Sequence, residues 1–285
     1  MAVKRPLRMA AVQFCGKVGM WQENLCRMRT HITRAHRGNA RLALFPEASL
    51  TGYVSGRKRI QATAQTIPGP GSDAIQDLAQ EIGIAVSVGI SERVNRKFYM
   101  SQLTALPDGT MHVYRKRYGR ERGFSRGEHV APFTYEGYRF GVAICMDARI
   151  YELYREYAYC GTDVILKPNC AWTGPWKEDR LKDFEEKKKA HSKYMRLDWQ
   201  KDSLFAATNG MAMLAANTVG DNNCGVFPGG CWFADGTGVV KRHLKIGYEK
   251  AKLKERTLFV QIDPDILAAA KERIRFDLKM ARTCR

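Results

Sequence analysis

Several patterns that would assign this chain to a common class are missing from its sequence. The 285 residues contain no run of eighteen apolar residues, so no transmembrane helix is expected. The N-terminus is basic but lacks the apolar region and cleavage site of a signal peptide, so we expect a cytoplasmic protein without a membrane partner. Repeats and low-complexity linkers are also absent. We therefore expect one domain over residues 1–285, with a basic C-terminal tail from about residue 270.

The cysteines and histidines do not follow the spacing of metal sites. Eight cysteines are present, but none forms a C-x-x-C pair and their spacing matches no zinc template. The six histidines are scattered along the chain. The sequence therefore predicts no metal site. In a reducing cytosol most of the thiols are expected to be buried packing residues.

Acidic residues are too few to balance the basic ones, which leaves a formal charge of +18. Such a charge attracts nucleic acid, an anionic membrane surface or an acidic substrate. The basic residues are spread along the chain, and acids interrupt the densest run, at 185–196, as is typical of a solvated helix face. No RRM, KH or helix-turn-helix signature appears, so nucleic acid is not the expected partner.

Segments with the pattern of strands alternate with segments of helical periodicity. Hairpins are predicted around Pro107-Asp108-Gly109 and Asp235-Gly236. One helix is predicted after a Pro/Gly turn, with Ser72 or Asp73 as its N-cap. Strands are predicted at 7–14, 40–49, 84–94, 138–145, 162–172 and 256–267, and helices at 21–37 and 149–160. The alternation indicates one α/β domain with mixed sheets that helices cover.

A polar residue follows three of these strands where a packed core would not need one. They are Glu47, Lys116 and Cys145. Each alone has a structural interpretation, as a cap or surface charge, a solvated lysine and a packing thiol. The carboxyl ends of strands are where α/β folds gather their active-site residues. Together, an acid, a base and a thiol in these places indicate a nucleophile system.

These three residue types fit one chemistry. A free thiol is mostly protonated at neutral pH, and a neighbouring carboxylate can take its proton as general base. An ammonium beside the carbonyl oxygen stabilises the charge of a tetrahedral intermediate. A backbone N–H just after the cysteine can supply a second donor.

Three stretches surround these residues: "FPEASLTGY", "YRKRYG" and "GVAICMDARIYELYRE". They resemble the Glu, Lys and Cys motifs of a known family, the carbon–nitrogen hydrolases, also called the nitrilase superfamily. Within this family, the chain resembles an amidase or carbamoylase. Similar stretches at "AAVQF", "GTDVILKPNCAW", "ATNGMAMLAANTVG", "PGGCWFADGTGVV" and "LFVQIDPDIL" extend the resemblance over nearly the whole chain in the right order. The resemblance implies a four-layer α-β-β-α sandwich of two mixed sheets flanked by helices.

The resemblance also implies roles and a reaction. Glu47 would be the general base, Lys116 the oxyanion stabiliser, Cys145 the nucleophile and the backbone N–H of Met146 the second oxyanion donor. The family hydrolyses amide or N-carbamoyl bonds of small linear molecules through a thioester, releases ammonia or an amine, and needs no metal or organic cofactor. A nitrilase would carry the same triad. An alternative of another class is a basic nucleic-acid-binding or scaffold protein on the same fold. The presence of all three triad residues argues against it, because such a protein would not need them.

Members often have a second glutamate in the loop after the lysine. Here "RERGFSRGE" offers Glu121, with Glu128 as the other choice, in a loop that looks shorter than usual and lacks His-Leu. Tyr151, Cys231 and Ala234 also depart from the residues common in the family, without touching the triad.

Four residues are expected to bind substrate: Tyr53, Arg149, Asn169 and Trp172. Arg149 either binds a substrate carboxylate or forms a structural ion pair with Asp147 or Glu152. The segment from Trp172 to Asn209 looks longer than usual and forms either a lid or an outer helix with a packed aromatic face.

Association into at least a homodimer is also expected. The helix after Cys145 carries apolar and aromatic residues that would be unusual on a bare solvent face. They are Tyr151, Leu153, Tyr154, Tyr157 and Tyr159.

Overall fold

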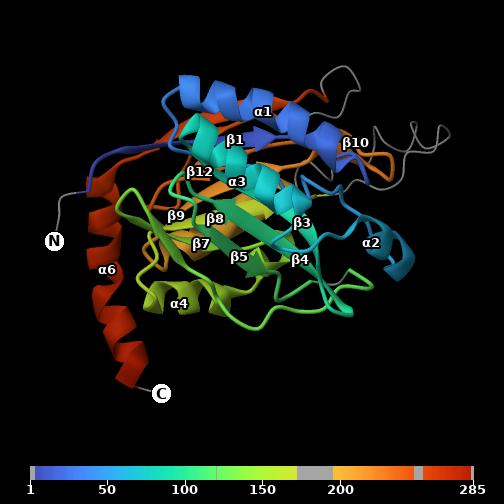
Figure 1. Ribbon diagram of the computed structural model, residues 1–285. Helices are drawn as coiled ribbons and strands as arrows, with labels where there is room; N and C mark the ends of the chain where they lie inside the picture. Colours follow the sequence, from blue (N-terminus) through green and yellow to red (C-terminus); the bar gives the residue numbers. More distant parts are fainter. Residues whose placement is uncertain (1–3, 120, 172–194, 247–252, 284–285) are drawn as a thin grey trace, which may run out of the picture.

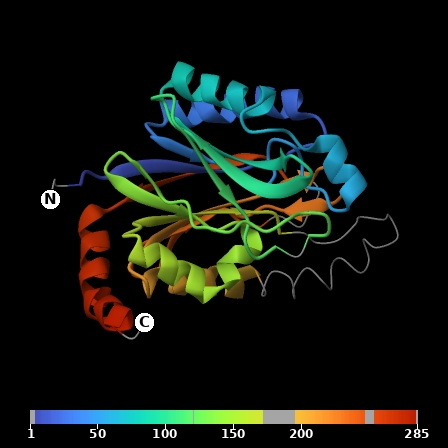
Figure 2. The ribbon, with the colours of Figure 1, turned by 60° about the horizontal axis from the view of Figure 1, so that its bottom comes forward.

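The computed structural model describes residues 4–119, 121–171, 195–246 and 253–283, with side chains up to residue 280. Two six-stranded mixed sheets lie face to face, and helices cover their outer faces, as the layers in Figure 1 and Figure 2 show. The predicted α-β-β-α sandwich is therefore confirmed. No helix in the described ranges is both long and apolar enough to cross a bilayer.

The first sheet has the strand order β14-β1-β2-β3-β4-β5. Its three central strands β1, β2 and β3 run parallel, while β14, β4 and β5 are added antiparallel to their neighbours. The bounds are β1 Leu7–Gln13, β2 Leu42–Leu44, β3 Ala85–Val94, β4 Lys97–Ala105, β5 Met111–Arg115 and β14 Arg256–Ile262. Glu47 and Lys116 follow strands of this sheet.

The second sheet has the order β13-β12-β9-β8-β7-β6, with β7, β8 and β9 parallel. Cys145 follows a strand of this sheet, so the three predicted catalytic residues come from both sheets. The bounds are β6 Phe133–Tyr135, β7 Tyr138–Val142, β8 Val164–Asn169, β9 Ala212–Asn217, β12 Trp232–Ala234 and β13 Val240–His243, with β10 Val219–Asp221 and β11 Val226–Pro228 as a separate hairpin.

Helices cover each sheet because their apolar residues recur at helical spacing. Helices α1 (Trp21–Arg37) and α3 (Pro70–Ile82) pack on the first sheet. Helix α4 (Tyr151–Tyr159), which follows the short helix η1 (Cys145–Arg149), packs on the second sheet together with a helix over 195–207. Helix α2 (Arg57–Thr63) lies beside the ends of β3 and β4, and α6 (Pro264–Thr283) runs along the opposite edge (Figure 1).

Alternation along the strands builds the core between the sheets. Met9 and Ala11 of β1 face the second sheet, whereas Ala10 and Val12 face the helices α1 and α3. Leu166 of β8 faces inward in the same way. Most of the contact between the two sheets is therefore apolar, and apolar packing has no preferred direction, which matters for how the triad is held.

Most predicted elements are confirmed, including both hairpins, but several bounds need correction. The strand predicted at 40–49, with Pro46 as its end, spans only Leu42–Leu44. The strand predicted at 256–267 ends at Ile262, and α6 begins at Pro264. The helix predicted to start at Ser72 or Asp73 starts at Pro70, and the Ser72 hydroxyl instead accepts a bond from the N–H of Gly69. The predicted basic tail is largely the helix α6, whose Leu267, Ala270 and Ile274 are buried.

Candidate active site

Glu47 sits in a tight loop that lies directly against β3. A Cβ on Gly89 would come within 2.0 Å of the backbone nitrogen of Ala48, so only glycine allows the loop this close. The N–H of Gly89 also donates to the Ser49 hydroxyl at 3.0 Å. The loop therefore holds Glu47 in a fixed place, where its side chain is buried.

Lys116 follows β5 and meets two carboxylates. Its ammonium lies 2.7 Å from Oε1 of Glu47 and 2.5 Å from Oε1 of Glu121. The Tyr53 hydroxyl lies 3.5 Å from the same Glu121 oxygen. The structure thus brings Glu121 to the lysine, whereas Glu128 is exposed and pairs with His129. A buried ammonium between two carboxylates has little freedom to move.

Cys145 begins η1, just past the end of β7. Its φ of +48° is in the left-handed region, which is uncommon for a residue with a side chain. The backbone N–H of Cys170, just past β8, acts to lower the pKa of the Cys145 thiol by hydrogen bonding, although burial outweighs it. Such strained backbone is typical of functional sites.

The electrostatics of the three groups depend on burial. Burial raises the pKa of Glu47 to about 7, although the Lys116 ammonium opposes the shift. Burial and then the Glu47 charge raise the pKa of the Cys145 thiol to about 12. Burial disfavours the charged Lys116, yet Glu47, Cys145 and Glu121 outweigh it, so the pKa of Lys116 is raised. Near neutral pH the site therefore holds an ammonium, a neutral thiol and a carboxyl group that is half ionised.

The free oxygen of Glu47 is available to the thiol. Oε1 faces Lys116, while Oε2 is buried and accepts no hydrogen bond from the described residues. The Cys145 side chain is close enough to lower the pKa of Glu47 by hydrogen bonding. This places a proton donor and an acceptor side by side.

The residues predicted to bind substrate have different surroundings. Tyr53 contacts Glu121, and Asn169 ends β8 and is almost fully buried. Arg149 forms an ion pair with Asp198 of the helix over 195–207, at 3.5 Å, and this partner differs from the predicted Asp147 or Glu152. Trp172 lies outside the described residues, as does most of the segment predicted as a lid or outer helix. From the described end of that segment, Met195 and Trp199 are buried.

The aromatic residues of α4 are not an exposed surface, which corrects the premise of the predicted dimer face. Leu153, Tyr154 and Tyr157 are fully buried under the second sheet, and Tyr151 packs edge-on against Phe205. These four side chains therefore pack within one chain, whereas Tyr159 is partly exposed. Association of the chain stays a prediction.

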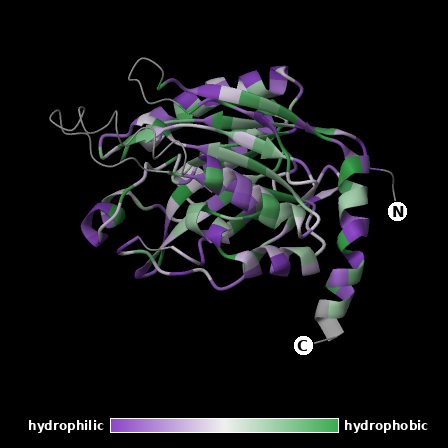
Figure 3. Cartoon of the chain, turned by 180° about the vertical axis from the view of Figure 1, so that it is seen from behind, coloured by the Kyte–Doolittle hydropathy of each residue, from purple (hydrophilic) through white to green (hydrophobic). Residues whose placement is uncertain are grey.

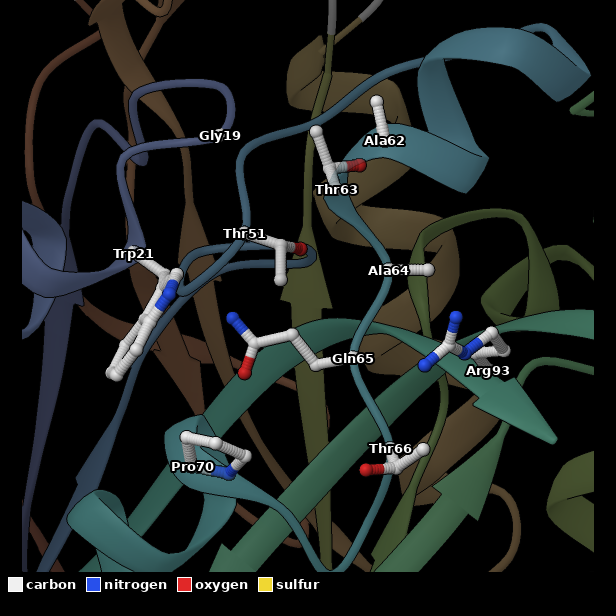
Figure 4. Close-up of a pocket in the computed structure, with 10 residues that line it drawn as sticks. All are labelled: Gly19, Trp21, Thr51, Ala62, Thr63, Ala64, Gln65, Thr66, Pro70 and Arg93. Carbon is white, nitrogen blue, oxygen red and sulfur yellow. The ribbon is translucent and has the colours of Figure 1, made fainter.

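A hollow of about 280 Å³ is shown in Figure 4. Its lining includes Trp21, Thr51, Gln65 and Arg93. It contains none of the three predicted catalytic residues. In the described part of the chain, no cluster of His, Cys, Asp or Glu could hold a metal.

Sequence reasoning missed two features of the site. Asp147 was considered only as a partner of Arg149, and Cys170 only as a packing thiol, although its backbone N–H faces Cys145. The position of Asp147 two residues after Cys145 was the only local signal. The partners of both residues come from distant segments, which the sequence does not bring together.

The family model of the carbon-nitrogen hydrolases matches residues 8–272, so the chain belongs to this family. An (R)-stereoselective amidase from a Pseudomonas species is 28 % identical over 57 % of this chain and 60 % of its own length. Matches to this and two further curated relatives span 52–66 % of those proteins.

Two solved structures share the fold. A carbon–nitrogen hydrolase superfamily protein from Xanthomonas campestris, with an arsenic adduct in its active site, has a TM-score of 0.76 at 19 % identity. The match covers 95 % of this chain and 96 % of that one. An amidase variant from a Nesterenkonia species, with the acetamide moiety of fluoroacetamide added covalently at its active-site cysteine, has a TM-score of 0.69 at 20 % identity, covering 95 % and 96 %.

Proposed function

We propose that the protein hydrolyses the C–N bond of a small linear amide or N-carbamoyl compound through a thioester on Cys145. The observation that carries the proposal is the buried contact of Lys116 with both Glu47 and Glu121, next to a thiol whose pKa the Glu47 charge raises. A plain core would not bury three charged groups around a cysteine, because each loses its hydration.

The first step is attack by the thiol on the carbonyl carbon. In the free site the proton stays on sulfur, because the pKa of Cys145 is about 12 and that of Glu47 about 7. Transfer of the proton to Glu47 is therefore coupled to formation of the C–S bond. A general base with a pKa near the working pH is best matched to this task.

The oxyanion that forms is stabilised by charge already in place. The Lys116 ammonium donates to it from one side and the backbone N–H of Met146 from the other. Because the pKa of Lys116 is raised, this lysine is charged throughout the neutral range. Donors that are fixed beforehand cost no reorganisation during the reaction.

The cycle closes with three proton transfers through Glu47. Glu47 gives its proton to the leaving nitrogen as the C–N bond breaks, which releases ammonia or an amine and leaves the thioester. Glu47 then takes a proton from water, whose oxygen attacks the thioester carbon. The C–S bond breaks, the acid leaves, and the proton on Glu47 returns to Cys145.

Relatives support this reaction class. The amidase from Pseudomonas supports an amide substrate, and the covalent addition at the cysteine of the Nesterenkonia amidase supports the nucleophile role of Cys145. A nitrile carbon would be attacked by the same thiol, and a relative from Pyrococcus abyssi, 29 % identical over 57 % of this chain, is named a nitrilase. Nitrile hydrolysis is therefore the second candidate.

Release of ammonia from a panel of linear amides, N-carbamoyl compounds and nitriles tests the proposal. We expect release from at least one amide or carbamoyl compound, and none from the Cys145→Ala protein. Release from nitriles alone would support the second candidate. If no compound is hydrolysed and the protein retains nucleic acid in a salt-dependent way, the catalytic proposal is wrong and the binding alternative holds.

A further inference from the structure

Asp147 is a fully buried carboxylate that joins the segment of Lys116 to the segment of Cys145. One oxygen, Oδ1, accepts bonds from the backbone N–H groups of Arg117 and Tyr118, at 3.1 and 2.7 Å. The other, Oδ2, accepts bonds from the Tyr114 hydroxyl at 2.8 Å and the N–H of Ile144 at 3.1 Å. Two of these donors come directly after Lys116, and one comes directly before Cys145.

This connection matters because the two catalytic residues belong to different sheets. Lys116 follows β5 of the first sheet, and Cys145 follows β7 of the second. The core between the sheets is largely apolar, and the backbone bridge that joins them, from Phe14 to Thr218, lies after β1 and β9 and not beside Lys116 or Cys145. Apolar packing is not directional, so it does not by itself fix the distance between an ammonium and a thiol to a few tenths of an ångström.

The donors around Asp147 indicate an ionised carboxylate. Three of the four are backbone N–H groups, which can only donate, and they favour the charged form against the burial that raises the pKa of Asp147. The bond to Ile144 also closes a tight turn in which Cys145 keeps its positive φ. Hydrogen bonds to a charged acceptor are roughly twice as strong as neutral ones. Directional hydrogen bonds of this strength can fix the position of the Lys116 segment relative to the Cys145 segment.

We propose that Asp147 is a positioning residue that sets the Lys116 ammonium at the distance from the Cys145 thiol that the oxyanion requires. Tyr114 assists it through the bond to Oδ2. Neither side chain touches the substrate in this scheme. The inference rests on the proposed function, since positioning matters only if the carbonyl of a substrate lies between the two groups.

The test is the Asp147→Asn protein, in which an amide N–H₂ group faces backbone donors. A misplacement of about 1 Å in such a site costs on the order of 100-fold in rate. We therefore expect kcat per reactive Cys145 to fall by about that factor with KM little changed. Reactive sites are counted by mass spectrometry after limiting alkylation, so misfolded protein does not enter the comparison.

Asp163→Asn is the matched control. Asp163 is also buried, accepts a bond from the N–H of Arg139 and pairs with Lys4 and Lys271. It lies at the start of β8, at the end away from Cys170 and the triad. Its loss is expected to lower the melting temperature but to leave kcat per reactive site within about twofold.

A second readout separates positioning from general damage. Alkylation of Cys145 by iodoacetamide needs the thiolate but no oxyanion donor, so its rate in Asp147→Asn is expected to stay within about threefold of the original protein. If alkylation falls in proportion to turnover, Asp147 acts on the thiol alone and the proposal is wrong. Unchanged kcat per reactive site, or an equal loss in Asp163→Asn, would also overturn it.

Two further measurements apply if Asp147→Asn does not fold or if the unaltered protein shows no activity. If Asp147→Asn does not fold, Tyr114→Phe removes one donor and is expected to lower kcat several-fold, with alkylation unchanged. If the unaltered protein hydrolyses no compound, the proposed function has failed. The positioning role is then tested by crystal structures, where Asp147→Asn should change the distance from Lys116 Nζ to Cys145 Sγ and Asp163→Asn should not.

Discussion

The carboxylate of Glu121 lies 2.5 Å from the ammonium of Lys116, which also contacts Glu47 at 2.7 Å. A second carboxylate keeps the lysine charged without using the oxygen of Glu47 that faces the thiol. Replacement of Glu121 by Gln is therefore expected to lower kcat by about 10- to 100-fold, because the lysine loses a charged partner. Ammonia release at saturating substrate measures the effect.

Glu128 provides the matched control for this substitution. It lies in the same loop, but it is exposed and pairs only loosely with His129 at 3.8 Å. Glu128→Gln is expected to change kcat by less than about twofold, as surface substitutions usually do. Equal losses in the two variants would show that the loop, and not the Glu121 carboxylate, determines the rate.

The dependence of kcat/KM on pH follows from the pKa of Glu47. The base must be ionised, and its pKa is about 7, so kcat/KM should rise as the pH increases through 7. No fall is expected below about pH 10, because the pKa of Lys116 is raised and that of Cys145 is about 12. An acid limb near the ordinary pKa of a carboxyl group would contradict this assignment.

The same reasoning predicts how Glu121→Gln moves the pH profile. The charge of Glu121 raises the pKa of Glu47. Its removal should lower that pKa, so the acid limb of kcat/KM shifts to a lower pH even though the rate falls. A shift to a higher pH, or no shift with a large loss of rate, would mean that Glu121 acts on Lys116 alone.

The two thiols at the site are expected to differ sharply. Cys145→Ala should reduce ammonia release by more than about a thousandfold, as loss of a nucleophile does. Cys170→Ala should keep activity within a few-fold, because its backbone N–H, which acts to lower the pKa of the Cys145 thiol, is retained. Mass spectrometry after brief treatment with iodoacetamide should find Cys145 modified faster in the active protein than the buried Cys15 or Cys231, because Glu47 beside Cys145 can accept the proton as the thiol reacts.

A basic surface beside the site predicts a preference for anionic substrates. Helix α2, the turn between β3 and β4, and the loop after Lys116 meet there, with the N–H of Gly56 donating to the carbonyl of Arg122. Figure 3 shows α2 as a hydrophilic helix at the edge opposite α6. Two of the acids on these segments, Glu92 and Glu121, pair with Arg115 and Lys116, and the exposed Glu128 lies 3.8 Å from His129. The exposed cations are Arg57, Lys58, Arg59, Arg93, Arg96, Lys97, Arg122 and Arg126.

Reversal of three charges on α2, as Arg57→Glu, Lys58→Glu and Arg59→Glu together, tests this surface. For an amide that carries a carboxylate, kcat/KM should fall by about tenfold, and the difference should shrink at high salt. A neutral amide of similar size should react at an unchanged rate. Equal effects on both amides would show that α2 supports the fold and does not attract the substrate.

The sequence predicted what depends on local pattern and missed what depends on contact between distant segments. Glu47, Lys116 and Cys145 were recognised because each follows a run of apolar residues that forms a strand. Helix α2 was missed, since Ile60 is its only buried residue and three charges begin it. The helical character of α6 was hidden in the same way, because charged residues surround Leu267, Ala270 and Ile274.

Asp147 shows the limit most clearly. Its four hydrogen-bond donors are separated from one another by up to 30 residues and lie on both sheets. These donors come together only because the two sheets pack against each other, and no local sequence pattern predicts that packing. From the sequence, Asp147 was expected only as a possible ion-pair partner of Arg149. In the structure Arg149 pairs with Asp198 instead.

The pairing of β1 with β14 also bears on how the protein is made. These neighbouring strands span Leu7–Gln13 and Arg256–Ile262, so one edge of β1 has no partner until nearly all of these residues have left the ribosome. An uncovered strand edge of that kind can pair with other chains. All the proposed catalytic groups have been synthesised by then, yet the first sheet is still open. The nascent protein is therefore exposed to aggregation in the interval after its proposed catalytic residues are synthesised and before β14 pairs with β1.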